Sequence, residues 1–239
     1  MTDPSYMSDR SPFLCALSAG TRAALERIGG TRDFSTGEVL ITEGDEQHDL
    51  WCLLEGKVKV TCLSDGRKPS LVDLKGACDV VGEIAAMDCG MRSATVTACA
   101  DGAARVIPRG ALEPFLLDHP DAMHALHQVV GDRLRRSDRQ RLEFGRYPVL
   151  VRLARVLLEL AEAHGTSTAE TARIDVNMTH SELASLVGAK TGTVQKALAE
   201  LGRNGLIETG EKRTHIRSKS GLRRVAQGHT SLRPVKYSA

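Results

Sequence analysis

Short runs rich in Val, Leu and Thr recur between Phe34 and about Ile107, separated by turns centred on glycine. VLIT, KVKVTCL and SATVTACA are examples, and the glycines recur at about the spacing of one strand plus one turn. Many short strands joined by tight glycine turns are typical of small antiparallel barrels and rolls. The pattern therefore predicts an antiparallel β-roll in the first half of the chain.

The pattern changes to a helical period at Pro120 and keeps it to about Phe144. Positions alternately four and three residues apart form one stripe, which is the a/d spacing with which two helices pack along a seam. The stripe consists of Met123, His127, Val130, Leu134, Ser137, Arg141 and Phe144. We predict a homodimer through residues 119–144, the alternative being a single amphipathic helix packed on its own roll.

The segment from Thr179 to Arg217 divides into a helix, a tight turn, a second helix and a β-hairpin. Thr179 and Glu182 have the spacing of a capping box, and Gly188 stands where a helix-turn-helix needs a residue without a Cβ. The outer face of the second helix carries Lys, Thr and Gln, which can contact phosphates and base edges in a major groove. The candidate DNA contacts are Thr179, His180, Lys190, Thr191, Gly192, Thr193, Gln195 and Lys196, with Lys212 and Arg213 at the hairpin tip.

Charge is distributed unevenly, although the whole chain carries a net charge of only +2. From Thr179 to Ala239 there are eleven basic and four acidic residues, so the rest of the chain is net acidic. A basic module joined to an acidic one is typical of proteins that bind nucleic-acid phosphates. We therefore predict double-stranded DNA as a partner, the alternative being a solvated basic surface.

Six cysteines lie among the first hundred residues without CxxC spacing: Cys15, Cys52, Cys62, Cys78, Cys89 and Cys99. No charged-then-apolar leader precedes them, and no apolar run is long enough to span a membrane. We therefore expect a cytoplasmic protein with reduced thiols, no membrane association and no bound metal. Because free cysteine packs as a small hydrophobe, we expect these thiols to fill core positions.

One segment of the predicted roll combines groups that suit a sugar phosphate. Residues 81–98 read VGEIAAMDCGMRSATVTA. Backbone amides, the Arg92 guanidinium and the Ser93 hydroxyl suit a phosphate, while the Glu83 carboxylate suits a ribose hydroxyl. The alternative is a purely structural ion pair between Glu83 and Arg92.

The motif GEIA followed by RSA resembles the phosphate-binding cassette of the CRP/FNR family of bacterial regulators, and the resemblance extends from about Phe13 to Ser218. It implies a cyclic nucleotide, cAMP or a relative of it, as the ligand. It also implies that Glu83 binds the ribose 2′-hydroxyl, that Arg92 and Ser93 bind the cyclic phosphate, and that Ser137 contacts adenine. The ligand-binding set so implied is Gly82, Glu83, Ile84, Ala85, Arg92, Ser93, Ala94, Ser137 and Asp138.

The sequence departs from the family pattern in two places. Asp138 stands where cAMP-binding members often carry a hydroxyl that reaches the partner subunit's ligand. In the second helix of the DNA-binding segment, Thr191 and Gly192 replace the usual Arg and Glu, and Lys196 keeps a basic base-reading position. The resemblance implies a dimer that reads a palindromic operator with half-sites about one helical turn apart, with RNA polymerase as a further partner.

The predicted fold class is α+β: an N-terminal antiparallel β-roll, a long dimerisation helix and a C-terminal winged helix-turn-helix. A hinge is expected near Gly145. A second apolar helix, interrupted by Arg152, Arg155 and Glu159, is expected from Pro148 to Ala163, and a polar loop is expected from His164 to Ala172. The expected segments are a flexible arm (1–12), the sensor roll (13–118), the dimerisation helix and hinge (119–145), the DNA-binding domain (146–218) and a basic tail (219–239).

Two other interpretations remain open. In the first, the DNA-binding half is retained and the roll is ligand-independent or senses redox state or haem, through the cysteines or through His48, His119 or His127. In the second, the chain is an enzyme or a cyclic-nucleotide-regulated enzyme subunit. The sequence contains no GxSxG, HExxH, P-loop or paired-carboxylate motif, so we expect a protein that is not an enzyme.

Overall fold

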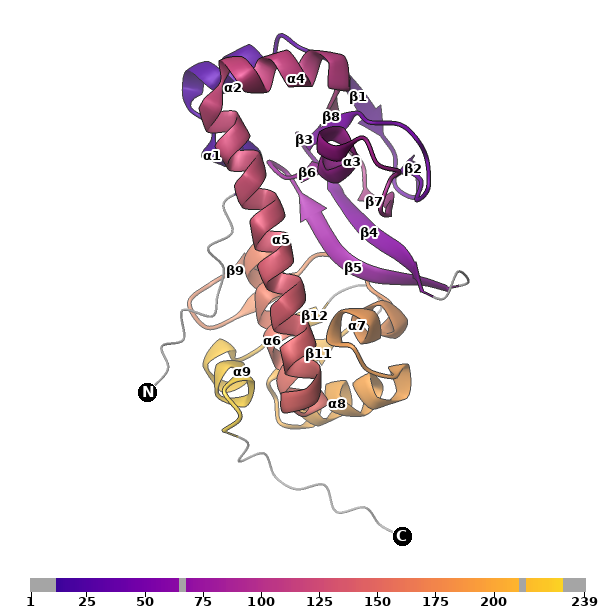
Figure 1. Ribbon diagram of the computed structural model, residues 1–239. Coiled ribbons are helices and arrows are strands. Elements are labelled where there is room, and N and C mark those ends of the chain that lie inside the picture. Colours follow the sequence, from indigo (N-terminus) through magenta and orange to yellow (C-terminus); the bar gives the residue numbers. More distant parts are fainter. Residues whose placement is uncertain (1–11, 65–67, 211–213, 230–239) are drawn as a thin grey trace. The chain divides into compact units, whose positions relative to one another are not determined.

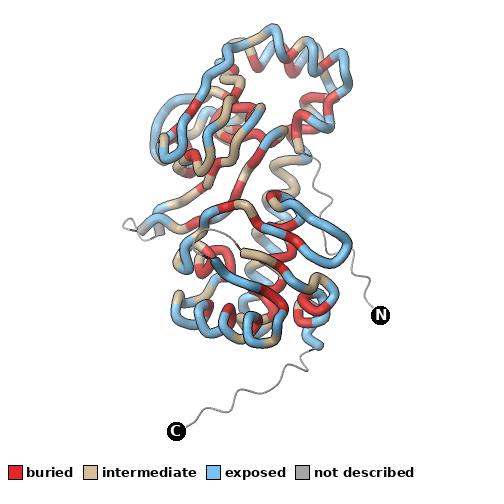
Figure 2. The backbone as a smooth tube through the Cα atoms, turned by 180° about the vertical axis from the view of Figure 1, so that it is seen from behind, coloured by how far each residue is buried: buried red, intermediate tan, exposed pale blue. Residues whose placement is uncertain are grey.

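The computed structural model describes residues 12–64, 68–210 and 214–229 (Figure 1). These residues form two compact units, and the boundary between them falls after Asp138. In each unit, buried segments alternate with exposed ones along the chain (Figure 2).

The first unit contains two four-stranded antiparallel sheets, as the glycine-punctuated pattern predicted. One sheet has the order β1-β8-β3-β6 and the other the order β2-β7-β4-β5. The strands are β1 (Gly30–Phe34), β2 (Val39–Ile41), β3 (Leu50–Leu53), β4 (Lys57–Ser64), β5 (Lys68–Gly76), β6 (Val80–Val81), β7 (Thr95–Ala100) and β8 (Gly102–Ile107). The predicted antiparallel roll is therefore confirmed.

The roll has two buried clusters. The first lies among the strands and includes Trp51, Leu53, Val58 and Val96. The second joins β3 and β8 to helices α1 (Phe13–Ala16), α2 (Ala19–Leu25), α4 (Arg109–Asp118) and the start of α5 (Pro120–Arg146). Helix α4 was not predicted; it carries Pro114 in its interior and buries Leu112, Phe115 and Leu116.

Helix α5 begins at Pro120, as predicted, and ends two residues beyond the expected Phe144. Its buried residues, Ala122, Ala125 and Leu126, all lie in the first two turns. Farther along, large apolar side chains are exposed on the single chain, including Leu134 and Phe144 of the predicted seam.

The second unit is built on helix α6 (Val149–His164) and contains α7 (His180–Val187), α8 (Thr191–Arg203) and α9 (Lys219–Ala226). Its four-stranded antiparallel sheet has the order β11-β12-β10-β9. The strands are β9 (Gly165–Ser167), β10 (Ala172–Ile174), β11 (Ile207–Thr209) and β12 (Thr214–Ile216). The predicted helix-turn-helix and hairpin are confirmed.

Two expectations for this unit were wrong. Residues 164–172 were expected to be a loop, but they include β9, which pairs with β10 as an edge of the sheet. Residues 219–226 were expected to belong to a tail, but they form α9, which buries Leu222 and Val225. Strand β9 is polar and is held by its pairing with β10, whereas α9 is held by its two buried apolar side chains.

The cysteines also differ from the expectation. Cys52 fills a core position, but Cys15 and Cys89 are exposed, and the other three cysteines are half-buried. Burial raises the pKa of Cys52 to about 12, so this thiol is protonated at neutral pH. Within the residues that the structure describes, no helix is long and apolar enough to cross a membrane.

Candidate functional site

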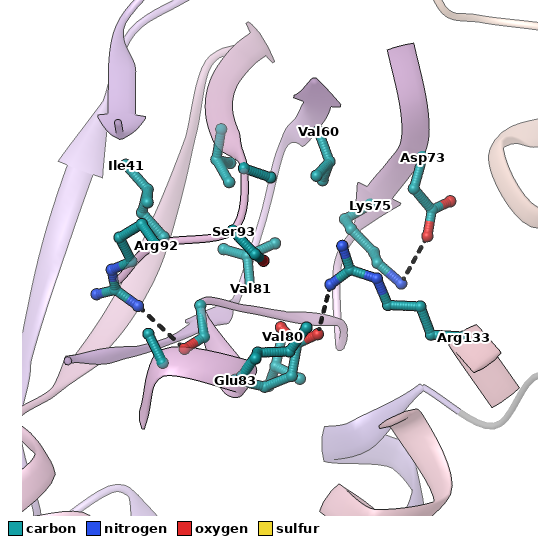
Figure 3. Close-up of a pocket in the computed structure, with 15 residues that line it drawn as sticks. Ile41, Val60, Asp73, Lys75, Val80, Val81, Glu83, Arg92, Ser93 and Arg133 are labelled. Atoms are coloured by element: carbon teal, nitrogen blue, oxygen red, sulfur yellow. Dashed lines mark hydrogen bonds and ion pairs between the residues drawn. The ribbon is translucent and has the colours of Figure 1, made fainter. Parts of the chain in front are cut away.

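A cleft opens in the roll beside α3 (Glu83–Asp88) and encloses about 430 Å³ of space, its open mouth included (Figure 3). Seven of the nine predicted ligand-binding residues line the cleft, namely Gly82, Glu83, Ile84, Ala85, Arg92, Ser93 and Ala94. The structure therefore brings the β6–α3 turn and the start of β7 to one place, although eight residues separate Glu83 from Arg92.

Gly82 is the residue on which the floor of the cleft depends. Its φ is +78°, a left-handed conformation that side chains rarely adopt. A Cβ built at this position would lie 2.3 Å from Nη1 of Arg92. Only glycine allows both the turn and the close approach of the guanidinium.

Arg92 is almost fully buried, with 3% of its surface exposed. Nη1 donates to the carbonyl of Gly82 (3.0 Å) and Nη2 donates to the carbonyl of Asp49 (2.8 Å). Its Nε is buried and lacks a hydrogen-bond partner, and desolvation lowers the pKa of the guanidinium. An arginine held by two carbonyls and still holding an unused donor suits an anion at the wall of the cleft.

Glu83 faces Arg133 rather than Arg92. Nη1 of Arg133, from α5, lies 2.9 Å from Oε1 of Glu83. Glu83 is only 4% exposed. The structural ion pair weighed for Glu83 and Arg92 is therefore replaced by a pair that joins the cleft floor to the long helix. Figure 3 shows the ion pair between Glu83 and Arg133 at the cleft.

Three charged residues that line the cleft were missed in the sequence. They are Asp73 and Lys75 on β5 and Arg133 on α5. Lys75 lies 3.0 Å from the carboxylate of Asp73, and Arg136 binds the same carboxylate with distances of 3.1 and 3.2 Å. The available signal was helical spacing, because Arg133 lies one turn before the predicted contact Ser137.

Ser137 and Asp138 are not among the residues that line the cleft of the single chain. Ser137 is half-buried and Asp138 is exposed. The histidines considered for haem, His48, His119 and His127, do not line it either. Within the described ranges, no group of three or more His, Cys, Asp or Glu side chains could hold a metal ion.

The second candidate site is the helix-turn-helix. Thr179 and Glu182 form the predicted capping box at the start of α7. Gly188 ends α7 with φ +64°, and its N–H donates to Ala184 and Ser185. Buried Val194, Leu198 and Leu201 then fix the inner face of α8. The turn and both helices therefore form for the reasons predicted above.

The opposite face of the two helices presents the predicted DNA contacts. The exposed ones are Thr179, His180, Lys190, Gly192, Thr193, Gln195 and Lys196, and Thr191 is half-buried. Gln195 Nε2 lies 3.2 Å from Nδ1 of His180, which links the start of α7 to α8. Lys212 and Arg213 lie outside the described residues.

Two arginines of α6, predicted only as interruptions of its apolar face, donate hydrogen bonds to the ends of other helices in this unit. Arg152 donates to the carbonyls of Val187 (2.7 Å) and Gly188 (3.1 Å), where α7 ends. Arg155 donates to Ala226 (2.8 Å) at the end of α9 and pairs with Glu143 of α5 (2.9 Å). Cationic donors at helix C-termini satisfy carbonyls that have no partner within the helix.

A ligand cleft in a β-roll, followed by a long helix and a winged helix-turn-helix, defines a ligand-responsive class of DNA-binding regulator. Residues 31–119 match the sequence model of the cyclic nucleotide-binding domain, and residues 151–225 match that of the Crp-like helix-turn-helix domain. The chain belongs to the CRP/FNR family of transcriptional regulators, and it is a DNA-binding regulator.

Individual relatives agree with this assignment. A Mycobacterium tuberculosis protein named "CRP-like cAMP-activated global transcriptional regulator" is 31% identical over 86% of this chain and 92% of its own length. "Transcriptional regulator LdrP" of Thermus thermophilus is 30% identical over 81% of this chain and 95% of its own. A solved CRP/FNR-family regulator, also from Thermus thermophilus, superposes with a TM-score of 0.67 and 26% identity, over 83% of this chain and 98% of that one.

Proposed function

We propose that this regulator binds a cyclic nucleotide such as cAMP in the cleft of its roll, and that the ligand controls how a homodimer binds a palindromic operator. The observation that carries the proposal is the convergence of Glu83, Arg92, Ser93 and Arg133 on one cleft. The relative described as cAMP-activated supports the same ligand class.

Each side chain has a distinct task in this proposal. The cyclic phosphate carries one negative charge, and it binds the unused Nε of Arg92 and the Ser93 hydroxyl. The Glu83 carboxylate accepts a hydrogen bond from the ribose 2′-hydroxyl. Arg133 then shares Glu83 with the ligand, so the long helix responds directly to the occupant of the cleft.

A ligand shifts a conformational equilibrium only if it binds the two states with different affinity. Contact with α5 through Arg133 provides that difference, because the pairing of two α5 helices depends on the position of this helix. Ser137 and Asp138 follow Arg133 by about one helical turn on α5. In this proposal both residues contact the base of the nucleotide, and Asp138 sets the base preference.

Calorimetric titration with cAMP and cGMP tests the ligand. We expect wild-type protein to bind, and Arg92→Ala to weaken binding by about tenfold or more, since a hydrogen bond to a charged group contributes about 1.5–3 kcal/mol. Arg92→Lys keeps the charge and serves where the alanine variant is unstable. Arg109→Ala, on α4, is the matched control. Unchanged binding by folded Arg92→Ala contradicts the phosphate role.

For DNA, the proposal assigns base edges to Gln195 and Lys196 and phosphates to Lys190 and the threonines, with Lys212 and Arg213 as wing contacts. Lys196→Ala is expected to cost about 1–3 kcal/mol and to relax specificity at one base pair of each half-site. Arg203→Ala, at the far end of α8, is the control. A uniform loss over all sequences shows that Lys196 contacts phosphate instead of a base.

The homodimer forms through residues 119–144, and its half-sites lie about one helical turn apart. On the single chain, 63% of Leu134 and 45% of Phe144 are exposed, which fits a seam that a second copy covers. The proposal also includes RNA polymerase as a partner. It places the protein in the cytoplasm, since a transcription regulator acts where DNA is transcribed.

A further inference from the structure

Two of the six cysteines lie side by side, although 62 residues separate them in the sequence. The backbone N–H of Leu14, in α1, donates to the carbonyl of Cys78 (3.0 Å), in the turn between β5 and β6. This bond places the backbone of Cys15 next to that of Cys78. Burial and the neighbouring Cys15 raise the pKa of Cys78. Other half-buried thiols point to the backbone: Cys62 donates to Ser93 and Cys99 to Lys57.

Cys78 has a backbone conformation that disfavours any side chain. Its φ is +70°, and in the described residues only Cys89 shares a positive φ among non-glycines. The turn is tight, since the N–H of Asp79 donates to Gly76 (3.1 Å) and the N–H of Gly76 donates to the Asp79 carboxylate (2.9 Å). Glycine is the residue that suits this turn position. A cysteine in this strained conformation points to a use for its thiol.

We propose that Cys15 and Cys78 form a reversible disulfide when the protein meets a peroxide. The bond ties α1 to the turn that leads into the cleft. Exposed Cys15 meets the oxidant first, and half-buried Cys78 resolves the product. Because Cys78 precedes Gly82 by only four residues, the tether restrains the floor of the cleft.

The chemistry is balanced by one molecule of hydrogen peroxide. The Cys15 thiolate attacks one oxygen, the O–O bond breaks, and the departing hydroxide takes up a proton to become water. Cys15 is then a sulfenic acid. The sulfur of Cys78 attacks the sulfur of Cys15, the S–O bond breaks, and the second hydroxide leaves with the Cys78 proton as water. A small thiol reverses the reaction by exchange.

The effect on the ligand rests on the proposed function. Entry of a nucleotide requires Glu83 to share its carboxylate between Arg133 and a sugar hydroxyl, so residues 79–83 must adjust. A disulfide at Cys78 restricts that adjustment. We expect oxidation to lower the affinity of the protein for cyclic nucleotide by about fivefold. This change lies at the lower end of the range that is typical when two sites are coupled.

The test treats the full-length protein with hydrogen peroxide, alkylates the remaining thiols and analyses the digest by mass spectrometry. Wild type and Cys89→Ser are expected to yield a peptide pair linked through Cys15 and Cys78, and their thermal midpoint is expected to rise on oxidation, because a cross-link restricts the unfolded chain. Cys15→Ser and Cys78→Gly should yield neither result. A thiol reductant should restore the starting midpoint.

Absence of the linked pair from oxidised wild type overturns the proposal, as does a midpoint rise that persists in Cys15→Ser. If the linked pair forms but the nucleotide affinity is unchanged, the restraint on the cleft is overturned. DNA binding by the reduced protein is measured in parallel. Loss of the disulfide with intact DNA binding therefore contradicts only this inference, whereas absent DNA binding under reducing conditions contradicts the proposed function.

Discussion

The ring of Phe144, near the end of α5, occupies the space that a side chain on Gly188 would need. A Cβ built on Gly188 would lie 2.2 Å from the ring, and the guanidinium of Arg152 covers the ring at 5.2 Å from its centroid. Gly188 is also the left-handed residue between α7 and α8. Within the second unit, the end of the long helix therefore touches the turn that orients the recognition helix.

The first prediction concerns this contact. Gly188→Ala places a Cβ at positive φ and against Phe144, so we expect the second unit to lose about 1–3 kcal/mol of stability. Urea unfolding followed by circular dichroism measures the loss. Gly202→Ala is the matched control, because its added Cβ meets only the carbonyl oxygen of Ile207 at 3.8 Å. Equal stability of both variants would show that the turn tolerates a side chain.

The second prediction concerns the buried arginine behind the turn. Arg152→Met removes the donors to Val187 and Gly188 and leaves two carbonyls at the end of α7 without these partners. We expect a loss of about 2 kcal/mol or more in unfolding free energy, together with weaker DNA binding. Arg224→Met, at an exposed position of α9, should stay within about 0.5 kcal/mol of wild type. Similar results for both variants contradict the supporting role of Arg152.

The third prediction is a pH dependence. Ser220 and Ser218 donate hydrogen bonds to Glu170, and they hold the pKa of that carboxyl below its ordinary value of 4.5. A pKa that is lower in the folded state gives stability that is complete above the ordinary value and is lost as the pH falls through the folded value. Glu170→Gln should therefore lower the unfolding midpoint at pH 7.

Below pH 4.5 the difference between Glu170→Gln and wild type should shrink, because the wild-type carboxyl becomes protonated. The exposed Glu162→Gln, on α6, serves as the comparison. A Glu170→Gln difference that is constant from pH 7 downward would show that the carboxylate charge does not support the start of α9.

The fourth prediction tests whether the predicted stripe of α5 forms the dimer interface, or whether any exposed apolar residue of this helix has the same effect. Leu134 lies on the predicted stripe, whereas Leu142, which is 74% exposed, lies off it. Leu134→Glu should convert dimer to monomer in sedimentation equilibrium, since it places like charges where the two helices meet. Leu142→Glu should leave the dimer intact. The opposite result assigns the interface to another face of the helix.

Much of this architecture could be predicted from local pattern. Glycine spacing indicated the roll, the capping pair Thr179 and Glu182 located α7, and the single residue Gly188 located the turn. Each of these features is formed by residues that are close together in the chain, so it can be recognised from the sequence alone. Helix α9 was missed because its apolar content is limited to Leu222 and Val225, and their burial depends on packing within the folded unit.

Some residues of the cleft could likewise be predicted from the sequence, and others could not. Gly82 in its floor and Arg92 in its wall lie within one short motif, so both residues could be identified. Arg133 could not, because its role depends on where α5 passes the roll, a long-range fact that helical spacing alone does not determine. Arg152 was missed for the same reason. The sequence shows a charged residue within an apolar stripe, but it does not show which distant carbonyls that residue binds.

We propose above that a cyclic nucleotide in the roll changes sequence-specific DNA binding. Anisotropy titration of a duplex selected from random sequences, with and without cAMP or cGMP and at two salt concentrations, tests it most directly. We predict salt-sensitive binding that favours the selected palindrome over a scrambled duplex, and a shift of about fivefold or more in Kd on adding one of these nucleotides. Equal affinity for the selected duplex, the scrambled duplex and a simple polyanion, whatever the nucleotide, would contradict it.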